Sequence, residues 1–145
     1  MIGNIKYPAK IEYLENILQF FRSCARNEGF SKRRISNIEL ALEEALANIC
    51  HHAYTVGTCG DMEIQCRTDD NKRLIIDIID TGKPYNILSA SEPELAADIS
   101  KRDLGGLGVL LIRSMVDDIH YCRRGNENVL TFVFIDRGDF AIAPS

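Results

Sequence analysis

Hydrophobic residues in the first 53 positions recur with the spacing of two amphipathic helices. After Pro8, a residue favoured at helix starts, apolar side chains follow at steps of three and four as far as Gly29, which is suited to ending a helix. A longer and stronger pattern opens near Ser31 and runs to about Ala53 as one continuous apolar stripe. The two predicted helices are defined by Ile11, Leu14, Leu18, Phe21 and Ala25, and by Ile35, Ile38, Leu42, Ala45 and Ile49.

The pattern then changes to the alternation and apolar runs of β-strands. Residues 62–66 alternate and lead, after a short turn, to the apolar run 74–79, so these two segments predict a β-hairpin. A second hairpin is predicted from residues 119–123 and 129–135, joined across residues 125–128. The second half of the chain is therefore expected to build a β-sheet.

A long irregular segment separates the two predicted hairpins. From Thr81 to Leu104 no regular period is visible, apart from one short helix expected around residues 93–99. Loops of this length inside a compact domain are usually functional, such as a lid over a site. A further helix is expected from about Gly108 to Asp117. This order of elements predicts an α+β two-layer sandwich, with helices on one face of a mixed β-sheet.

Composition narrows the class of protein. The chain has 145 residues, of which 46% are hydrophobic and 26% charged, as is ordinary for one globular domain spanning residues 1–145. The net charge of −4, without a basic run, argues against direct binding to nucleic acid or to an anionic membrane. Because no apolar stretch reaches the length of a membrane span and the N-terminus lacks a signal-peptide layout, we expect a cytoplasmic protein.

The five cysteines favour reduced thiols over disulfides or structural zinc. Their number is odd and none forms a C-x-x-C pair. A metal site at Cys50, His51, His52 and Cys59 stays an alternative, although its spacing matches no common zinc pattern.

The glycines at 105, 106 and 108 are the first candidate for chemistry. They leave bare backbone just before a predicted helix, and the unpaired amides of a helix start carry partial positive charge that suits a phosphate. An ordinary turn or helix cap would use the same glycines. Taken alone, this motif leaves both interpretations open.

Glu44 and Asn48 are the second candidate. They are four residues apart on the second predicted helix, so they share a face, and that face points away from the apolar stripe. Glu44 could supply a general base, and Asn48 could supply an oxygen ligand to Mg²⁺. The alternative is a solvated helix face without chemistry.

Asp80 and Gly82 are the third candidate, directly after the apolar run 74–79. A carboxylate at this place can accept a hydrogen bond from the exocyclic amine of a nucleotide base, while the glycine lets the ring approach. The same residues would also serve as an ordinary strand end followed by a turn.

In this order the three elements resemble the Bergerat-type ATP-binding fold of the GHKL superfamily, which includes DNA gyrase, heat-shock chaperones, histidine kinases and mismatch-repair ATPases. Within it, the chain is most similar to the anti-sigma-factor serine/threonine kinases of bacterial stress and sporulation control. The resemblance covers nearly the whole chain. It rests on residues 44–48 with His52, on Pro84, on the run 105–112 and on residues 128–132.

This resemblance implies a single histidine-kinase-like ATPase domain with an ATP lid at about residues 83–104. Asp80 would bind the adenine amine, and Gly82 would make room for the ring, with Pro84 beside it. Thr131, on the last predicted strand, would place its hydroxyl near the adenine.

The resemblance also implies roles at the phosphate end of ATP. Asn48 would coordinate Mg²⁺, and Glu44 would accept the proton of the attacking serine or threonine hydroxyl. Related kinases often carry a basic residue just before the glycines, where this chain has Leu104, so Arg102 (or its neighbour Lys101) would have to reach the γ-phosphate from the lid. The phosphates would be held by backbone amides of Gly105, Gly106, Leu107 and Gly108.

The function implied is a Mg-ATP-dependent serine/threonine protein kinase that phosphorylates an anti-anti-sigma partner with a STAS domain and sequesters a sigma factor. Leu104 leaves a second hypothesis open, a nucleotide-gated binding module of the same fold that is catalytically weak or inactive. The ATP-binding half of a histidine kinase fits less well, because no dimerising helical pair with a phosphoacceptor histidine is visible. The resemblance also suggests a homodimer, for which Phe20 and Phe21 offer apolar surface.

Overall fold

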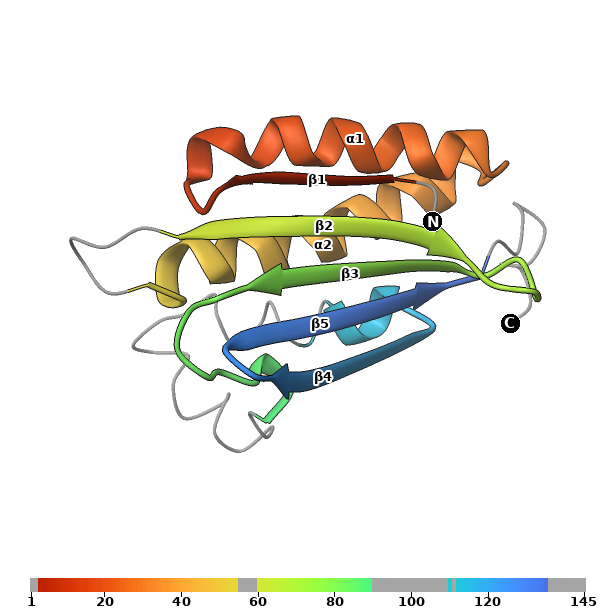
Figure 1. The fold of residues 1–145 in the computed structure, drawn as a ribbon. Helices are drawn as coiled ribbons and strands as arrows, with labels where there is room; N and C mark the ends of the chain where they lie inside the picture. The colour runs from red at the N-terminus through yellow and green to blue at the C-terminus, as the bar shows by residue number, and fades with distance from the viewer. Residues whose placement is uncertain (1–2, 55–59, 90–109, 111, 136–145) are drawn as a thin grey trace.

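Five strands form one sheet and two long helices cover one of its faces (Figure 1). The computed structural model describes residues 3–54, 60–89, 110 and 112–135. Its elements are β1 (Gly3–Pro8), η1 (Ile11–Tyr13), α1 (Leu14–Asn27), α2 (Lys32–His52), β2 (Asp61–Thr68), β3 (Leu74–Asp80), η2 (Ile87–Ser89), β4 (Asp118–Arg124) and β5 (Glu127–Phe134). Residue 110 and residues 112–115 are also helical. Within these ranges, every helix is too short or too polar to cross a membrane.

The predicted α+β two-layer sandwich is confirmed, but its sheet is antiparallel rather than mixed. The strand order is β1-β2-β3-β5-β4, and all four pairings of neighbouring strands are antiparallel. β3 and β4, which flank the long irregular segment, do run in the same direction. They are not neighbours, however, because β5 folds back from β4 and lies between them.

The N-terminal strand β1 was not predicted from the sequence. It pairs with β2 along its whole length, with Ile5 and Tyr7 packed against the core. Since β1 continues to Pro8 and a short 3-10 helix follows, α1 begins only at Leu14. Ile11, which the sequence placed on the first helix, is instead 50% exposed.

The two long helices bury the stripes that the sequence predicts. Ser31 caps α2 by accepting a hydrogen bond from the Arg34 amide at 3.2 Å, and α1 ends before Gly29, whose φ is +87°. Phe21 is 0% exposed, so it belongs to the core and is not available for the suggested dimer contact. The helices and the inner face of the sheet share one hydrophobic core.

The turn between β2 and β3 is organised by Asp69. Its Oδ1 atom accepts hydrogen bonds from the amides of Asn71 and Arg73, both at 3.0 Å, and its Oδ2 atom pairs with the Arg73 side chain. The hydrogen bond from the Arg73 amide, together with the bond from its side chain, lowers the pKa of the Asp69 carboxyl. The predicted hairpin is therefore confirmed, with its turn held by an aspartate.

The turn between β4 and β5 is shorter than predicted. Glu127 already pairs with Arg124, so only Gly125 and Asn126 form the turn, and Gly125 adopts a positive φ of 62°. The predicted four-residue turn is therefore a two-residue turn.

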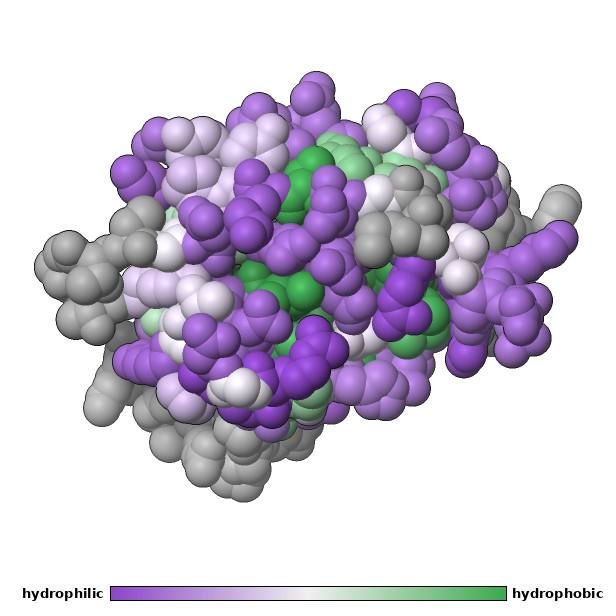
Figure 2. Space-filling model, in the orientation of Figure 1, coloured by the Kyte–Doolittle hydropathy of each residue, from purple (hydrophilic) through white to green (hydrophobic). Residues whose placement is uncertain are grey.

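The outer face of the sheet carries an apolar centre with a polar surround (Figure 2). On this face, Asp77 of β3 lies opposite Thr131 of β5, and the Thr131 hydroxyl donates a hydrogen bond to its carboxylate. Arg67 of β2 also contacts Asp77, at 3.4 Å. The apolar side chains that flank this polar pair are Ile75, Ile79, Val129 and Val133.

Candidate functional site

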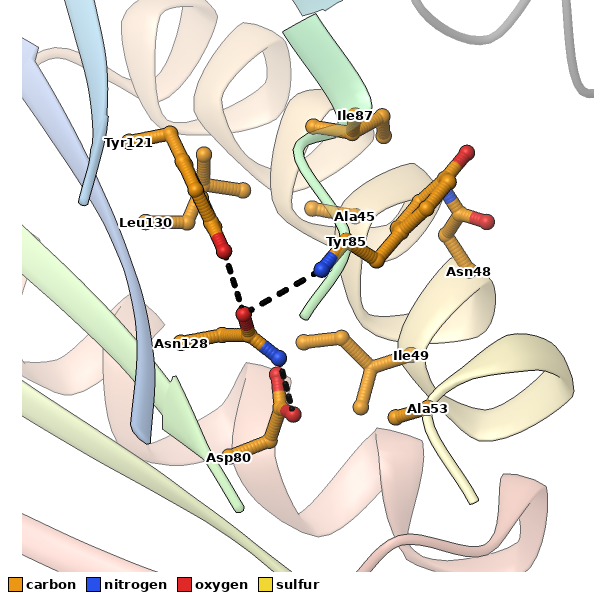
Figure 3. A pocket seen from close by; sticks show the side chains of 10 residues that line it. All are labelled: Ala45, Asn48, Ile49, Ala53, Asp80, Tyr85, Ile87, Tyr121, Asn128 and Leu130. Atoms are coloured by element: carbon orange, nitrogen blue, oxygen red, sulfur yellow. Dashed lines mark hydrogen bonds between the residues drawn. The ribbon is translucent and has the colours of Figure 1, made fainter. Parts of the chain in front are cut away.

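A cavity opens between the C-terminal half of α2 and the adjoining ends of β3, β4 and β5 (Figure 3). Its volume is about 400 Å³, which includes the part open to solvent. Most of its wall is apolar, with a few polar side chains among it. The cavity is lined by Ala45, Asn48, Ile49, Ala53, Asp80, Tyr85, Ile87, Tyr121, Asn128 and Leu130.

Two residues predicted from the sequence, Asn48 and Asp80, meet at this cavity. They come from different elements: Asn48 from α2 and Asp80 from the last position of β3. In Figure 3, Tyr85 lies beside Asn48, and Asp80 lies at the other side of the cavity. Glu44 lies one turn before Asn48 on α2, half-buried, and contacts no hydrogen-bond donor among the described residues.

Asp80 presents a buried carboxylate to the cavity. The residue is 5% exposed, and its Oδ1 atom accepts hydrogen bonds from the Gly82 amide and from Asn128 Nδ2, each at 2.9 Å. No donor in the described part of the chain reaches Oδ2. A buried acceptor without a partner costs about 1–3 kcal/mol, so this oxygen favours a ligand or water that donates a hydrogen bond.

Asn128, which sequence reasoning did not assign to the site, connects its parts. It is 5% exposed and lies directly opposite Asp80 in the β3–β5 pairing. Its Nδ2 donates to Asp80 and to the Lys83 carbonyl oxygen at 2.9 Å, while its Oδ1 accepts from the Tyr121 hydroxyl and from the Tyr85 amide at 3.3 Å. The sequence signal was an asparagine at the start of a buried strand, but its register opposite Asp80 was not evident.

Gly82 lies against the end of α2, where there is no space for a side chain. A Cβ atom on Gly82 would lie 2.1 Å from the Ala53 carbonyl oxygen, which also accepts a hydrogen bond from the Lys83 amide at 3.1 Å. Arg123 donates a hydrogen bond to the Gly82 carbonyl at 2.8 Å. Neither Gly82 nor Pro84 lines the cavity, and Pro84 is exposed, so the predicted role of Gly82 in admitting a ring stays a prediction.

Thr131 does not line the cavity either. Alternate residues of a strand point to opposite faces, and Thr131 shares the outer face with Asp77, its hydrogen-bond partner. The residues of β5 on the cavity side are Asn128 and Leu130. The predicted place of the Thr131 hydroxyl near the adenine does not agree with this geometry, in which the hydroxyl binds Asp77 on the outer face.

The remaining predicted positions lie outside the described residues. These are Arg102 with Lys101 and Leu104, and the glycine segment of Gly105, Gly106, Leu107 and Gly108. The same holds for most of the predicted lid and for the short helix expected around residues 93–99. Their roles stay predictions from the sequence.

Cys50, part of the alternative metal cluster, points into the core. Its Sγ atom lies 4.0 Å from the sulfur of Met62, and burial raises the pKa of the thiol to about 11. A metal requires the thiolate, which this burial disfavours at neutral pH. Cys59 lies outside the described residues.

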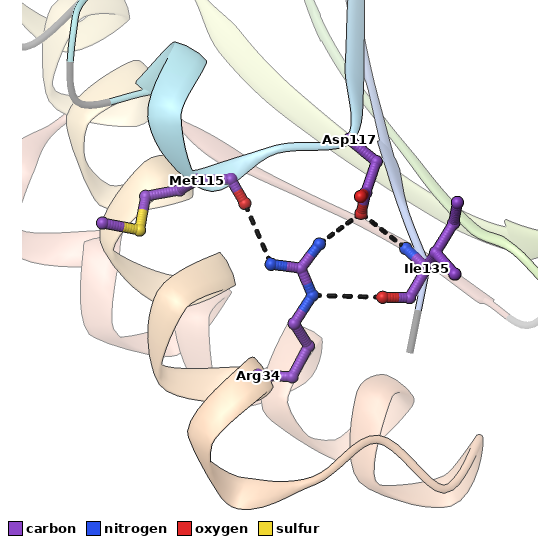
Figure 4. A network of polar contacts seen from close by, with 4 residues as sticks. All are labelled: Arg34, Met115, Asp117 and Ile135. Atoms are coloured by element: carbon purple, nitrogen blue, oxygen red, sulfur yellow. Dashed lines mark hydrogen bonds and ion pairs between the residues drawn. The ribbon is translucent and has the colours of Figure 1, made fainter. Parts of the chain in front are cut away.

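A second polar network, around Arg34 at the other end of α2, holds the helix that follows the glycine segment (Figure 4). Arg34 forms an ion pair with Asp117 and donates hydrogen bonds to the carbonyls of Met115 at 3.2 Å and Ile135 at 3.1 Å. The Arg34 and Asp117 side chains are 13% and 6% exposed, and the guanidinium lies 5.7 Å from the ring centre of Phe134. Arg34 thus joins α2 to the end of the helical residues 112–115 and to the end of β5.

The apolar walls and the polar side chains of the cavity fit a nucleotide. Apolar walls suit the faces of a base, and the free oxygen of Asp80 suits an exocyclic amine. The amide oxygen of Asn48 is a ligand of the type that Mg²⁺ prefers, and Mg²⁺ usually takes few protein ligands beside phosphate and water.

Comparison with known proteins points to the same class of site. The model of the histidine kinase-like ATPase domain family matches residues 7–134. The serine-protein kinase RsbW of Bacillus thuringiensis is 31% identical over 137 residues, which cover 92% of this chain and 84% of the relative. The RsbW serine-protein kinase of Listeria innocua is 26% identical over 132 residues, covering 88% of this chain and 83% of the relative.

Solved structures show the same fold. The RsbU and RsbW domains of a Mycobacterium tuberculosis protein align with a TM-score of 0.63 at 13% identity, covering 91% of this chain and 32% of that one. A blue-light activated histidine kinase from Erythrobacter litoralis aligns with a TM-score of 0.61 at 15% identity, covering 90% and 43%. This chain therefore spans less than half the length of these two solved chains.

Replacing Gly82 with alanine tests the close approach to α2. We expect Gly82→Ala to lower the free energy of unfolding by about 1–3 kcal/mol in urea titrations, because the added Cβ meets backbone that cannot move aside. Gly125→Asn is the matched control: Gly125 has open space around it, and asparagine tolerates its positive φ, so we expect a loss below about 1 kcal/mol. A Gly82→Ala protein as stable as the wild type would contradict this interpretation.

Replacing Arg34 tests the second network. Arg34→Leu removes the guanidinium from a buried carboxylate and from two carbonyls, so we expect the free energy of unfolding to fall by about 3 kcal/mol. Arg124→Leu serves as the control, since the Arg124–Glu127 pair is 3.8 Å long with side chains 63% and 38% exposed, and we expect a loss below about 1 kcal/mol. Equal losses from the two substitutions would show that Arg34 is not an anchor.

Proposed function

The chain belongs to the histidine kinase-like ATPase family and to its group of RsbW serine-protein kinases, and we propose that it is a Mg-ATP-dependent serine/threonine protein kinase acting as an anti-sigma factor. In this proposal it phosphorylates an anti-anti-sigma partner with a STAS domain and sequesters a sigma factor in the cytoplasm. The observation that carries the proposal is the buried Asp80 carboxylate, with one free oxygen at an apolar cavity that Asn48 also lines.

Asp80 would recognise the adenine end of ATP. Its Oδ2 atom would accept a hydrogen bond from the exocyclic amine, while Ile49, Ile87 and Leu130 provide apolar surface for the ring. A carboxylate that is already oriented by two hydrogen bonds needs little reorganisation to accept a third. This support is independent of sequence similarity, because it rests on burial and on hydrogen-bond counting.

Asn48 and Glu44 would act at the phosphate end of bound ATP. Asn48 would hold Mg²⁺ through its amide oxygen, and bound Mg-ATP would supply the phosphoryl group for transfer. Glu44, one turn earlier on the same face of α2, would take the proton from the hydroxyl of the partner's serine or threonine. The backbone of residues 105–108 would bind phosphate and Arg102 would offset negative charge, as the sequence resemblance implies.

Asp80→Asn tests the adenine assignment. The substituted amide would turn its oxygen toward the two donors that Asp80 now accepts from, so its NH₂ group would face the amine of the base. We expect ATP affinity, measured by isothermal titration calorimetry with Mg²⁺, to fall about 10- to 100-fold. Asp77→Asn, also buried on β3 but facing outward, should leave the affinity unchanged. The assignment would be refuted if both variants lowered ATP affinity equally, or if neither variant lowered it.

Glu44→Gln tests the kinase chemistry. Incubating the protein with γ-labelled ATP, Mg²⁺ and candidate STAS partners encoded beside it should transfer label to a partner serine or threonine. The Glu44→Gln variant should bind ATP normally and transfer label about 10²- to 10⁴-fold more slowly, whereas Glu43→Gln, its exposed neighbour, should match the wild type.

Two results would overturn parts of this proposal. Transfer by Glu44→Gln at the wild-type rate would remove Glu44 as the base. A wild-type protein that binds ATP and retains a partner, but transfers no label to it, would establish the nucleotide-gated binding module in place of the kinase.

A further inference from the structure

We infer that Asn128, held by Tyr121, is a positioning residue that makes the cavity selective for adenine over guanine. The inference rests on the proposed nucleotide site and extends it, because the family resemblance assigned no role to Asn128 or to Tyr121. It follows from the way hydrogen bonds are shared between Asn128 and the carboxylate of Asp80.

The side-chain amide of Asn128 has one orientation only. The carbonyl oxygen of Lys83 can only accept a hydrogen bond and the amide of Tyr85 can only donate one, so Nδ2 must face Lys83 and Oδ1 must face Tyr85. A flipped amide would place oxygen against oxygen at Lys83. The residue is 5% exposed, so water cannot readily compensate for such a mismatch.

This fixed orientation determines which oxygen of Asp80 is available. Asn128 Nδ2 and the Gly82 amide both donate to Oδ1, at 2.9 Å each, and thereby occupy it. Within the described residues, Oδ2 receives no donor, and Asp80 lines the cavity. The cavity therefore offers one carboxylate acceptor rather than two.

One acceptor favours adenine over guanine. Adenine presents one exocyclic amine on its base-pairing edge, which a single oxygen can accept. Guanine presents two adjacent donors, N1–H and the 2-amine, which a carboxylate with both oxygens free can accept together. Because Asn128 and the Gly82 amide together fill the acceptor positions of Asp80 Oδ1, guanine would leave one donor unpaired inside the cavity, and a site rejects ligands whose polar groups stay unpaired.

Tyr121 supports this arrangement from the edge strand β4. Its hydroxyl donates to Asn128 Oδ1, and its ring lines the cavity, so it contacts Asn128 directly and acts on Asp80 only through Asn128. The other donor to Asn128 Oδ1 is the backbone amide of Tyr85, at the longer distance of 3.3 Å. Removing only the Tyr121 hydroxyl should therefore loosen the side-chain amide of Asn128, while the Tyr121 ring still lines the cavity.

The test compares ADP with GDP, which removes phosphoryl transfer from the readout. Isothermal titration calorimetry with Mg²⁺ should show that the wild type binds ADP at least about 10-fold more tightly than GDP. Asn128→Ala leaves the Gly82 amide as the one described donor to Asp80 Oδ1, so that oxygen can accept a ligand donor as well, and the ratio should fall about 10-fold through weaker ADP and stronger GDP binding. Tyr121→Phe keeps the ring and should reduce the ratio about 2- to 10-fold.

Thr131→Val is the matched control for these variants. Thr131 lies three positions after Asn128 on β5 and also makes a side-chain hydrogen bond to an aspartate of β3, but on the outer face. Its removal should leave the ADP-to-GDP ratio unchanged. Circular dichroism spectra matching the wild type identify the variants that are folded, and Tyr121→Phe is the conservative one among them.

The outcomes separate the inference from the proposed function. If the wild type is selective for ADP and the folded Tyr121→Phe and Asn128→Ala variants keep its ratio, or lose affinity for both nucleotides equally, the inference is overturned while the nucleotide site stands. If the wild type binds neither nucleotide, the proposed function fails and the inference with it.

Discussion

The antiparallel register of β3 and β5 is the constraint on which the candidate site depends. It places Asp80 directly opposite Asn128 on the side of the helices, and Asp77 opposite Thr131 on the outer side. A slip of one residue would exchange these faces, turning the outer pair toward the core. Two side-chain hydrogen bonds join residues that lie directly opposite each other in this register, from Asn128 to Asp80 and from Thr131 to Asp77.

Helix α2 connects the site to the rest of the molecule. At its C-terminal end, the Ala53 carbonyl receives the Lys83 amide and leaves no space for a side chain at Gly82, which brings the end of β3 against the helix. At its N-terminal end, Arg34 binds the Asp117 carboxylate and the backbone carbonyls of Met115 and Ile135. Asn48 and Asp80 therefore lie on elements that are packed and hydrogen-bonded at both ends, as a preorganised binding site requires.

Much of the fold could be predicted from local sequence signals, but features that depend on the pairing of distant segments could not. The cap at Ser31 and the apolar stripe marked α2, and the hairpin turns marked β2 to β5. β1 was missed because only Ile5 and Tyr7 alternate before Pro8, which also reads as a helix start. Asn48 and Asp80 were predicted from residue type and position, whereas Thr131 was assigned from the family resemblance alone. The contacts of Asn128 could not be predicted, because its place opposite Asp80 depends on the pairing of strands far apart in the sequence.

Membership of the RsbW serine-protein kinase group and the free oxygen of Asp80 support the same account, in which Asp80 recognises the amine of adenine. The most direct test is the affinity of the wild-type protein for ADP and for purine riboside 5′-diphosphate, which lacks only that amine, measured by isothermal titration calorimetry with Mg²⁺. The account predicts that the analogue binds about 10- to 100-fold more weakly than ADP, since it leaves the buried acceptor unpaired. Equal affinities for the two ligands would contradict it.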